Sequence, residues 1–267
     1  MTVGDALGAS IDALTAAGCD TPRLDAELML ADAMGVERAL VVADPSRAVP
    51  PAAARLFGER VRRRVMREPV AYILGHQAFR HIELEVDARV LIPRPETELL
   101  VECAADMPEG SSVHDIGTGS GAIALAIKQE RPDMRVSGSD AWPAAIDVAR
   151  ANAARLRLDV AFDVADGWPG SPAADADLIV ANLPYVRADE WDALQPEIRL
   201  YEPRSALTAG ADGLDAIRAL VATAPAGTQL ALEHAPAQSA AVRALLVGAE
   251  TLRDLAGRER VTLGSVP

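Results

Sequence analysis

Cysteine is scarce in this chain of 267 residues, which has only Cys19 and Cys103. Two cysteines are too few for a disulfide framework or a zinc cluster, and the four histidines have no metal-ligand spacing, so we expect no metal and a reducing, cytoplasmic location. Long apolar runs are also missing. The longest, Ala122 to Ile127, is far shorter than the roughly 18 residues that a membrane span needs. No basic residue precedes Arg23, so the N-terminus lacks the charged start of a secretory signal.

Positive charge is in short supply, with Lys+Arg 26 against Asp+Glu 39 and a net charge of −13. A field of that sign repels phosphate backbones, so we expect no stable binding of nucleic acid. Half of the residues are hydrophobic and 24% are charged, which is typical of a folded globular protein. At roughly 150 residues per domain, the length predicts about two domains.

The pattern of the chain changes near residue 70. Before it we expect helices over Val3–Ala17, Thr21–Met34 and Pro51–Met66, with Thr21 as the N-cap of the second. Apolar residues then alternate through Ile82 to Val86 and recur at Val90 to Ile92, which indicates a hairpin or extended connector. We therefore predict a helical domain over 1–70, a hairpin or linker over 71–95 and a larger domain over 96–267.

The larger domain alternates strand and helix patterns. Candidate strands are predicted at Ser112–Ile116, Arg135–Ser139, Val160–Val164, Asp177–Ala181 and Gln229–Glu233. Helical patterns separate or follow them at Ala122–Glu130, Pro143–Leu156, Leu214–Thr223 and Ala237–Leu246. This alternation predicts an α/β fold, a doubly wound and mostly parallel sheet with helices on both faces.

A glycine-rich turn follows the first of these strands and opens a helix. It consists of Gly117, Thr118, Gly119, Ser120 and Gly121. Glycine lets the backbone turn tightly and approach a ligand at the helix N-terminus. Asp140 ends the next strand, where nucleotide-binding folds place a carboxylate that accepts hydrogen bonds from ribose hydroxyls. The turn alone also fits a dinucleotide fingerprint, so a dinucleotide and the methyl donor S-adenosylmethionine both remain candidate ligands.

The segment Asn182-Leu183-Pro184-Tyr185 ends the fourth strand, on the side where open α/β sheets bind ligands. An amide nitrogen is a poor nucleophile, because its lone pair is delocalised into the carbonyl. An enzyme that methylates it should therefore accept hydrogen bonds from both of its N–H groups and hold the nitrogen in line with the methyl group of the donor. Asn182 offers a side-chain carbonyl and Leu183 a backbone carbonyl, while Pro184 stiffens the turn. Tyr185 offers an aromatic face to the amide and the cationic methyl.

Two further features have competing interpretations. Trp168 follows the third strand, where its ring could border an adenine or simply pack in the interior. Six arginines crowd the segment from Arg55 to Arg67; they could meet an acidic partner, although a solvated helix face is the more common outcome.

Together these motifs resemble the release-factor glutamine methyltransferases of the PrmC/HemK family over nearly the whole chain. The segments that carry the resemblance are the glycine turn, Glu68 to Gly75, Leu91 to Glu98, Asn182 to Val186, Glu197 to Pro203 and Asp254 to Arg258. The resemblance implies a Rossmann-like class I methyltransferase with a small helical N-terminal domain that grips the release factor. It also implies transfer of a methyl group from S-adenosylmethionine to the side-chain nitrogen of the glutamine in the Gly-Gly-Gln motif of peptide chain release factors, leaving S-adenosylhomocysteine.

Carried over residue by residue, the resemblance places the methyl donor against the glycine turn from Gly117 to Gly121, Asp140, Trp168 and Asn182. It places the substrate glutamine against Asn182, Leu183, Pro184 and Tyr185. The family pattern is Asn-Pro-Pro-Tyr, and this chain has Leu183 at the first proline, which removes a conformational lock but keeps the backbone carbonyl. We expect a monomer that remains active.

Two other functions use the same motifs. An N6-adenine methyltransferase of DNA or RNA would handle an exocyclic amine with the same Asn-x-Pro-Tyr device, but the net charge of −13 opposes it. A non-catalytic binding module with a nucleotide fold is supported only by Leu183.

Overall fold

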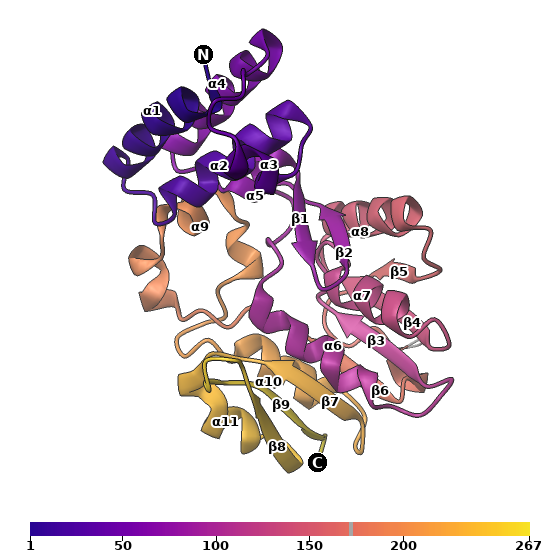
Figure 1. The fold of residues 1–267 in the computed structure, drawn as a ribbon. Helices are drawn as coiled ribbons and strands as arrows, with labels where there is room; N and C mark the ends of the chain where they lie inside the picture. The colour runs from indigo at the N-terminus through magenta and orange to yellow at the C-terminus, as the bar shows by residue number, and fades with distance from the viewer. Residues whose placement is uncertain (171–172) are drawn as a thin grey trace. The chain divides into compact units, whose positions relative to one another are not determined.

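The computed structural model describes residues 1–170 and 173–267 and divides the chain into two compact units. The first comprises Met1–Gly75 together with Gln195–Tyr201, and the second comprises His76–Leu194 and Glu202–Pro267. Figure 1 shows the elements of both. Within the described ranges no helix is both long and apolar enough to cross a membrane.

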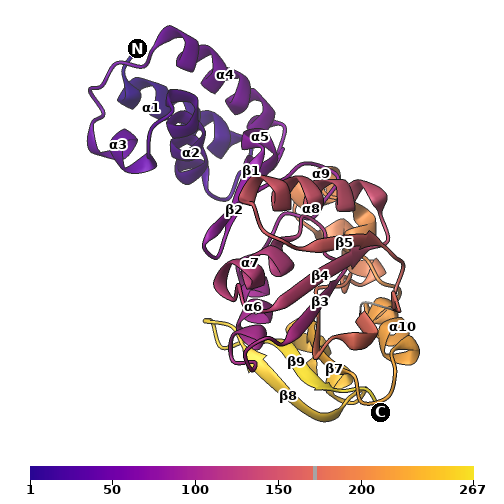
Figure 2. The same cartoon turned by 90° about the vertical axis from the view of Figure 1, so that its right-hand side faces the viewer.

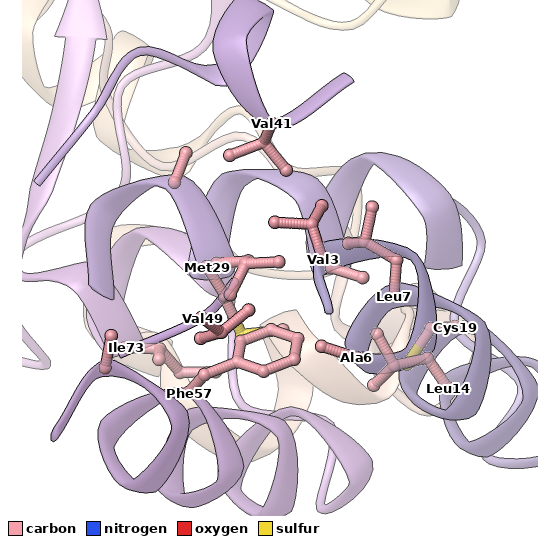
Figure 3. Close-up of a cluster of buried hydrophobic side chains, with 14 residues drawn as sticks. Val3, Ala6, Leu7, Leu14, Cys19, Met29, Val41, Val49, Phe57 and Ile73 are labelled. Carbon is pink, nitrogen blue, oxygen red and sulfur yellow. The ribbon is translucent and has the colours of Figure 1, made fainter. Parts of the chain in front are cut away.

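The first unit is helical. Its helices are α1 (Val3–Ala16), α2 (Pro22–Met34), α3 (Arg38–Ala43), α4 (Pro51–Val65), α5 (Val70–Leu74) and α9 (Pro196–Tyr201). The apolar faces of α1 to α5 meet in one core, in which Met29, Phe57 and Leu14 are among the buried side chains (Figure 3). The three long helices predicted from the sequence are confirmed to within a residue or two at each end.

In this unit one detail of the prediction is confirmed in position, the N-cap of α2, and another, the solvation of the arginine-rich helix, is only partly met. Thr21 occupies the N-cap position of α2, but its hydroxyl accepts no backbone N–H and instead donates to Asp25 Oδ1 at 2.7 Å. The arginine-rich face of α4 is not simply solvated. Arg64 is only 5% exposed and pairs with Asp25 at 2.7 Å and Glu197 at 2.8 Å.

The short helix α9 joins this unit through ion pairs of its Glu197 with Arg64 and Arg67. Glu197 also pairs with Arg67 at 2.6 Å, and the Tyr201 hydroxyl donates to the carbonyl of Met66 at 2.7 Å. The sequence contained no sign of this, because residues 195–201 lie between two strands of the other unit.

The second unit begins with a hairpin of β1 (His76–Phe79) and β2 (Ile82–Glu85), which confirms the predicted hairpin. Val90 and Ile92 are buried, but residues 90–92 form no strand. The buried Asn152 fixes the hairpin to the rest of the unit: it accepts from Glu85 N–H at 2.8 Å and donates to the carbonyl of Ser120 at 3.0 Å.

A seven-stranded sheet forms the centre of the second unit. Its order is β5-β4-β3-β6-β7-β9-β8, and only the pairings of β9 are antiparallel. The strands are β3 (Ser112–Ile116), β4 (Arg135–Asp140), β5 (Ala161–Val164), β6 (Leu178–Ala181), β7 (Gln229–Glu233), β8 (Val247–Arg253) and β9 (Glu259–Ser265). The five predicted strands are confirmed; β8 and β9 were missed.

Helices cover both faces of this sheet, as the prediction of a doubly wound α/β fold requires. They are α6 (Glu98–Ala105), α7 (Ala122–Glu130), α8 (Pro143–Leu156), α10 (Asp215–Thr223) and α11 (Ser239–Arg243). Figure 2 shows α6 and α7 on one face and α10 on the other. Ile217 and Leu220 of α10 pack on alternate residues of β6 and β7, such as Ile179. Five short 3₁₀ helices complete the described elements: η1 (Pro95–Thr97), η2 (Ala173–Asp175), η3 (Ala188–Ala193), η4 (Arg204–Ala206) and η5 (Pro236–Gln238).

Candidate active site

The glycine turn joins β3 to α7 at the carboxyl edge of the sheet. Gly117, Gly119 and Gly121 all have positive φ (75°, 55° and 82°), a conformation that other residues rarely adopt. A Cβ on Gly121 would lie 2.9 Å from Leu125 Cδ1, whereas at Gly119 it would project into open space. The turn therefore packs against other side chains at Gly121, whereas at Gly119 there is space for a ligand next to the backbone.

A buried carboxylate supports this turn from below. Asp115 is fully buried, and its Oδ2 accepts from the Thr118 hydroxyl at 2.6 Å, while its Oδ1 has no partner among the described residues. Burial raises the pKa of Asp115 to about 7.

Asp140 connects the glycine turn with the loop that follows β4. Its Oδ2 accepts from Gly119 N–H at 3.0 Å and its Oδ1 from Trp142 N–H at 2.9 Å. The residue is 9% exposed. Burial raises the pKa of the Asp140 carboxyl, and the two backbone N–H groups oppose that shift. Each oxygen keeps a further lone pair for a ligand hydroxyl.

Asn182 begins the Asn-Leu-Pro-Tyr segment directly after β6. Its Nδ2 donates to Thr97 Oγ1 at 3.0 Å. Thr97 is 4% exposed and ends η1, 85 residues earlier in the chain. This bond fixes the orientation of the side-chain amide, so that Oδ1 remains available as an acceptor.

Tyr185, at the end of the segment, is held by a second buried carboxylate. Its hydroxyl donates to Glu233 Oε1 at 3.0 Å. Burial raises the pKa of Tyr185, and the Glu233 carboxylate raises it further. Leu183 points its side chain towards the glycine turn, since a Cβ on Gly117 would lie 3.1 Å from Leu183 Cδ2.

These elements surround a cavity of about 590 Å³ in the second unit. Of the residues predicted from the sequence, those that line it are Gly117, Thr118, Gly119, Ser120, Asp140, Asn182, Leu183 and Pro184. Gly121, Tyr185 and Trp168 are not among the lining residues. Trp168 packs against the apolar cluster around Ile217, although its neighbours Asp166 and Gly167 do line the cavity.

Several lining residues were not predicted as site residues. Trp142, 57% exposed, lies beside Asp140, while Pro93, Arg94 and Thr97 come from the Pro-Arg-Pro-Glu-Thr-Glu segment. The signal for the latter was present, since that segment carried much of the family resemblance. A tryptophan two residues after the candidate ribose-binding acid was the signal for Trp142.

Ion pairs join the distant signature segments around the cavity. Arg94 pairs with Glu202, whose other oxygen accepts Ile92 N–H at 3.2 Å. Glu96 pairs with Arg258 at 3.0 Å, in the turn between β8 and β9. The motifs that are separate in the sequence therefore form one structural frame.

Comparison with known proteins agrees with this geometry. Residues 95–200 match the family model described as "Methyltransferase small domain", so the sheet and its cavity define a Rossmann-like, class I S-adenosylmethionine-dependent methyltransferase. Residues 5–75 match the model described as "PrmC N-terminal domain".

Full-length relatives narrow the class to one family. The chain is 41% identical to the release factor glutamine methyltransferase of Caulobacter vibrioides, over 99% of this chain and 96% of that protein. It is 40% identical to that of Cereibacter sphaeroides (100% and 99% covered) and 46% identical to that of Pseudomonas aeruginosa (92% and 94% covered). The chain belongs to the release factor glutamine methyltransferase family.

Proposed function

We propose that this chain transfers the methyl group of S-adenosylmethionine to the side-chain amide nitrogen of the glutamine in the Gly-Gly-Gln motif of peptide chain release factors. Relatives named for this activity at 40–46% identity over almost the whole chain support the proposal and favour it over an N6-adenine methyltransferase. The observation that carries it is the orientation of Asn182, whose amide nitrogen is committed to Thr97 so that its oxygen can accept from a substrate amide.

The donor fits the glycine-turn side of the cavity. Gly119 has open space where a side chain would stand, and Asp140 presents a buried carboxylate with lone pairs suited to ribose hydroxyls. We propose that the turn from Gly117 to Gly121, Asp140 and Asn182 bind the donor, with Trp142 and Asp166 bordering it. Trp168 supports the same loop through its packing against the apolar cluster.

The substrate glutamine fits the other side of the cavity. Asn182 Oδ1 and the backbone carbonyl of Leu183 accept the two amide N–H groups, and Pro184 holds the turn. The donor supplies an electrophilic methyl on a sulfonium: the new C–N bond forms as the C–S bond breaks, and the sulfur leaves as a neutral thioether. The amide nitrogen gains positive charge during transfer, so both acceptors bind it more strongly in the transition state.

Release of the amide proton to solvent water completes the transfer. Methyl transfer from a sulfonium needs no strong base if that proton leaves late, so we assign no general base. We further propose that the first unit binds the body of the release factor, since it matches the N-terminal family model.

A mass measurement tests the proposal. The chain is incubated with S-adenosylmethionine and a purified release factor, and we expect one added methyl on the glutamine of the Gly-Gly-Gln peptide. Asn182→Ala should lower kcat about 100-fold or more with little change in KM for the release factor. A near-normal kcat in this variant would show that the segment is only a structural turn.

Asn182→Asp serves as the matched variant. It keeps an oxygen acceptor but loses the donor to Thr97 and adds negative charge beside the sulfonium. We expect it to bind S-adenosylmethionine at least as well as the native protein while still losing kcat. Methylation of DNA or RNA oligonucleotides, but not of release factor, would instead support the adenine methyltransferase.

A further inference from the structure

The carboxylate of Glu233 is buried beneath the candidate active site and does not line the cavity. Glu233 ends β7 and is 1% exposed. Its Oε1 accepts from the Tyr185 hydroxyl, while Oε2 has no hydrogen-bond partner in the described ranges. Burying a carboxylate in this way is costly, so a role is expected for it.

Charged neighbours of Glu233 have other partners. Arg260 of β9 and Glu96 of η1 both influence it electrostatically. Arg260, however, pairs with Asp254 at 3.2 Å and Glu96 at 3.7 Å. The groups that hydrogen-bond with Glu233 are therefore two hydroxyls, those of Tyr185 and Thr97, and not a cation. Both hydroxyls lower the pKa of Glu233, but burial raises it by more.

Those two hydroxyls lead to the two ends of the Asn-Leu-Pro-Tyr segment. Tyr185 ends the segment and is bound to Glu233 directly. Asn182 begins it and donates to Thr97 Oγ1. Because Thr97 Oγ1 already accepts from Asn182, its own proton is free to turn towards another acceptor, and Glu233 is the carboxylate beside it.

We propose that Glu233 is the positioning residue of the active site, which orients the Tyr185 ring directly and the Asn182 amide through Thr97. The inference rests on the function proposed above, since it concerns the same substrate amide. A carboxylate has two acceptor oxygens, so in its ionised form it can serve both hydroxyls at once. A protonated carboxyl keeps only one good acceptor oxygen, so one of the two hydroxyls loses its hydrogen-bond acceptor.

Ionisation of Glu233 then couples methyl transfer to pH. Burial raises the pKa of Glu233 to about 7. Since the ionised form is the one that orders both hydroxyls, kcat should rise as the pH increases through about 7. The groups that act on Glu233 are the hydroxyls of Tyr185 and Thr97 and the charged side chains of Arg260 and Glu96.

The first test is kinetic and uses the full chain with release factor. Glu233→Gln keeps the size of the side chain but has one acceptor oxygen. We expect kcat to fall about tenfold, KM for release factor to stay within about twofold, and the rise of kcat between pH 6 and 8 to disappear. Unchanged kcat, or a variant with the same pH profile as the native protein, would overturn the proposal.

A double-variant cycle tests the shared path. Tyr185→Phe and Thr97→Val each remove one hydroxyl, and Thr97→Ser is the matched variant that keeps it. If Glu233 acts through both hydroxyls, adding Glu233→Gln to the Tyr185→Phe, Thr97→Val pair should lower kcat by no more than about twofold further. Fully additive losses would show that Glu233 acts in another way.

An optical titration separates this proposal from the proposed function. Tyr185 is one of three tyrosines, so its phenolate absorbance is the difference between the native protein and Tyr185→Phe. The Glu233 carboxylate raises the pKa of Tyr185, so Glu233→Gln should let the phenol ionise at lower pH. No shift would refute the contact. A shift in a protein that fails to methylate release factor would uphold the contact and refute the function.

Discussion

Replacing Asp140 with Asn is the sharpest test of the donor site, because this side chain holds two loops at once. Its two oxygens each accept one backbone N–H, from Gly119 at 3.0 Å and from Trp142 at 2.9 Å. Asn has nearly the same shape but only one acceptor oxygen. In Asp140→Asn, therefore, one of those N–H groups faces an NH₂ group that cannot accept it.

The magnitude follows from the hydrogen bonds that are lost. A hydrogen bond to a charged group contributes about 1.5–3 kcal/mol. In Asp140→Asn the single remaining oxygen is taken by one backbone N–H, and no charged oxygen is left to accept hydrogen bonds from the ribose hydroxyls. The loss then appears in binding, where it corresponds to a rise in the Kd for S-adenosylmethionine of roughly 10- to 150-fold.

Calorimetry with S-adenosylmethionine measures this change. Asp163→Asn is the matched control, since that side chain is 64% exposed on β5 and lies outside the cavity lining. We also expect the native affinity to fall on acidification earlier than for an ordinary aspartate, because burial raises the pKa of Asp140 and the ionised form binds. Equal Kd values for native protein and Asp140→Asn would refute the assignment of Asp140 to the donor.

Three further predictions concern stability. Gly121→Ala adds a Cβ 2.9 Å from a neighbouring side chain at positive φ and should cost about 1–3 kcal/mol, whereas Gly110→Ala, also at positive φ but in open space, should cost less; their Tm values compare them. Arg64→Met leaves the buried Asp25 without its cation, while Glu197 keeps Arg67, and should cost about 3–5 kcal/mol in denaturant unfolding, against about 0.5 kcal/mol or less for the exposed Arg62→Met. Burial lowers the pKa of His114 to about 4, so the stability that the neutral ring contributes is complete above its ordinary pKa and is lost as the pH falls towards 4. Between pH 7 and pH 5 the free energy of unfolding of the native protein should therefore fall by about 2 kcal/mol more than that of His114→Gln. An equal fall in the two proteins would contradict this.

The centre of the sheet was predictable because strands such as β6 and β7 are buried on both faces. β6, with the sequence Leu-Ile-Val-Ala, therefore appears as a short, continuous apolar run, as does the Leu-Ala-Leu stretch of β7. β8 gave no such signal: it is largely exposed, contains Gly248, and pairs only with β9. Tertiary pairing, rather than its own residue pattern, makes it a strand.

The candidate site was predictable only where its residues are close in the sequence. The glycine turn and Asp140 have a fixed spacing along two neighbouring strands, and the Asn-Leu-Pro-Tyr segment is contiguous. Glu233 was not predicted as a site residue, because it lies 48 residues after Tyr185 and no local pattern marks it. Thr97 belongs to a recognised signature segment, but its contact with Asn182, 85 residues later, is defined only by how the chain folds back.

The ion pairs of α9 also constrain the order in which the protein can be made. A ribosome releases residues 1–75 long before Glu197, yet Arg64 is buried in the first unit against that glutamate. Domains at the N-terminus usually fold first during synthesis. Here Arg64 already has Asp25 as its partner, but Glu197, which also pairs with Arg67, becomes available only after about 120 further residues have emerged. The last folding step of the first unit is thus delayed until the middle of the methyltransferase unit has been translated.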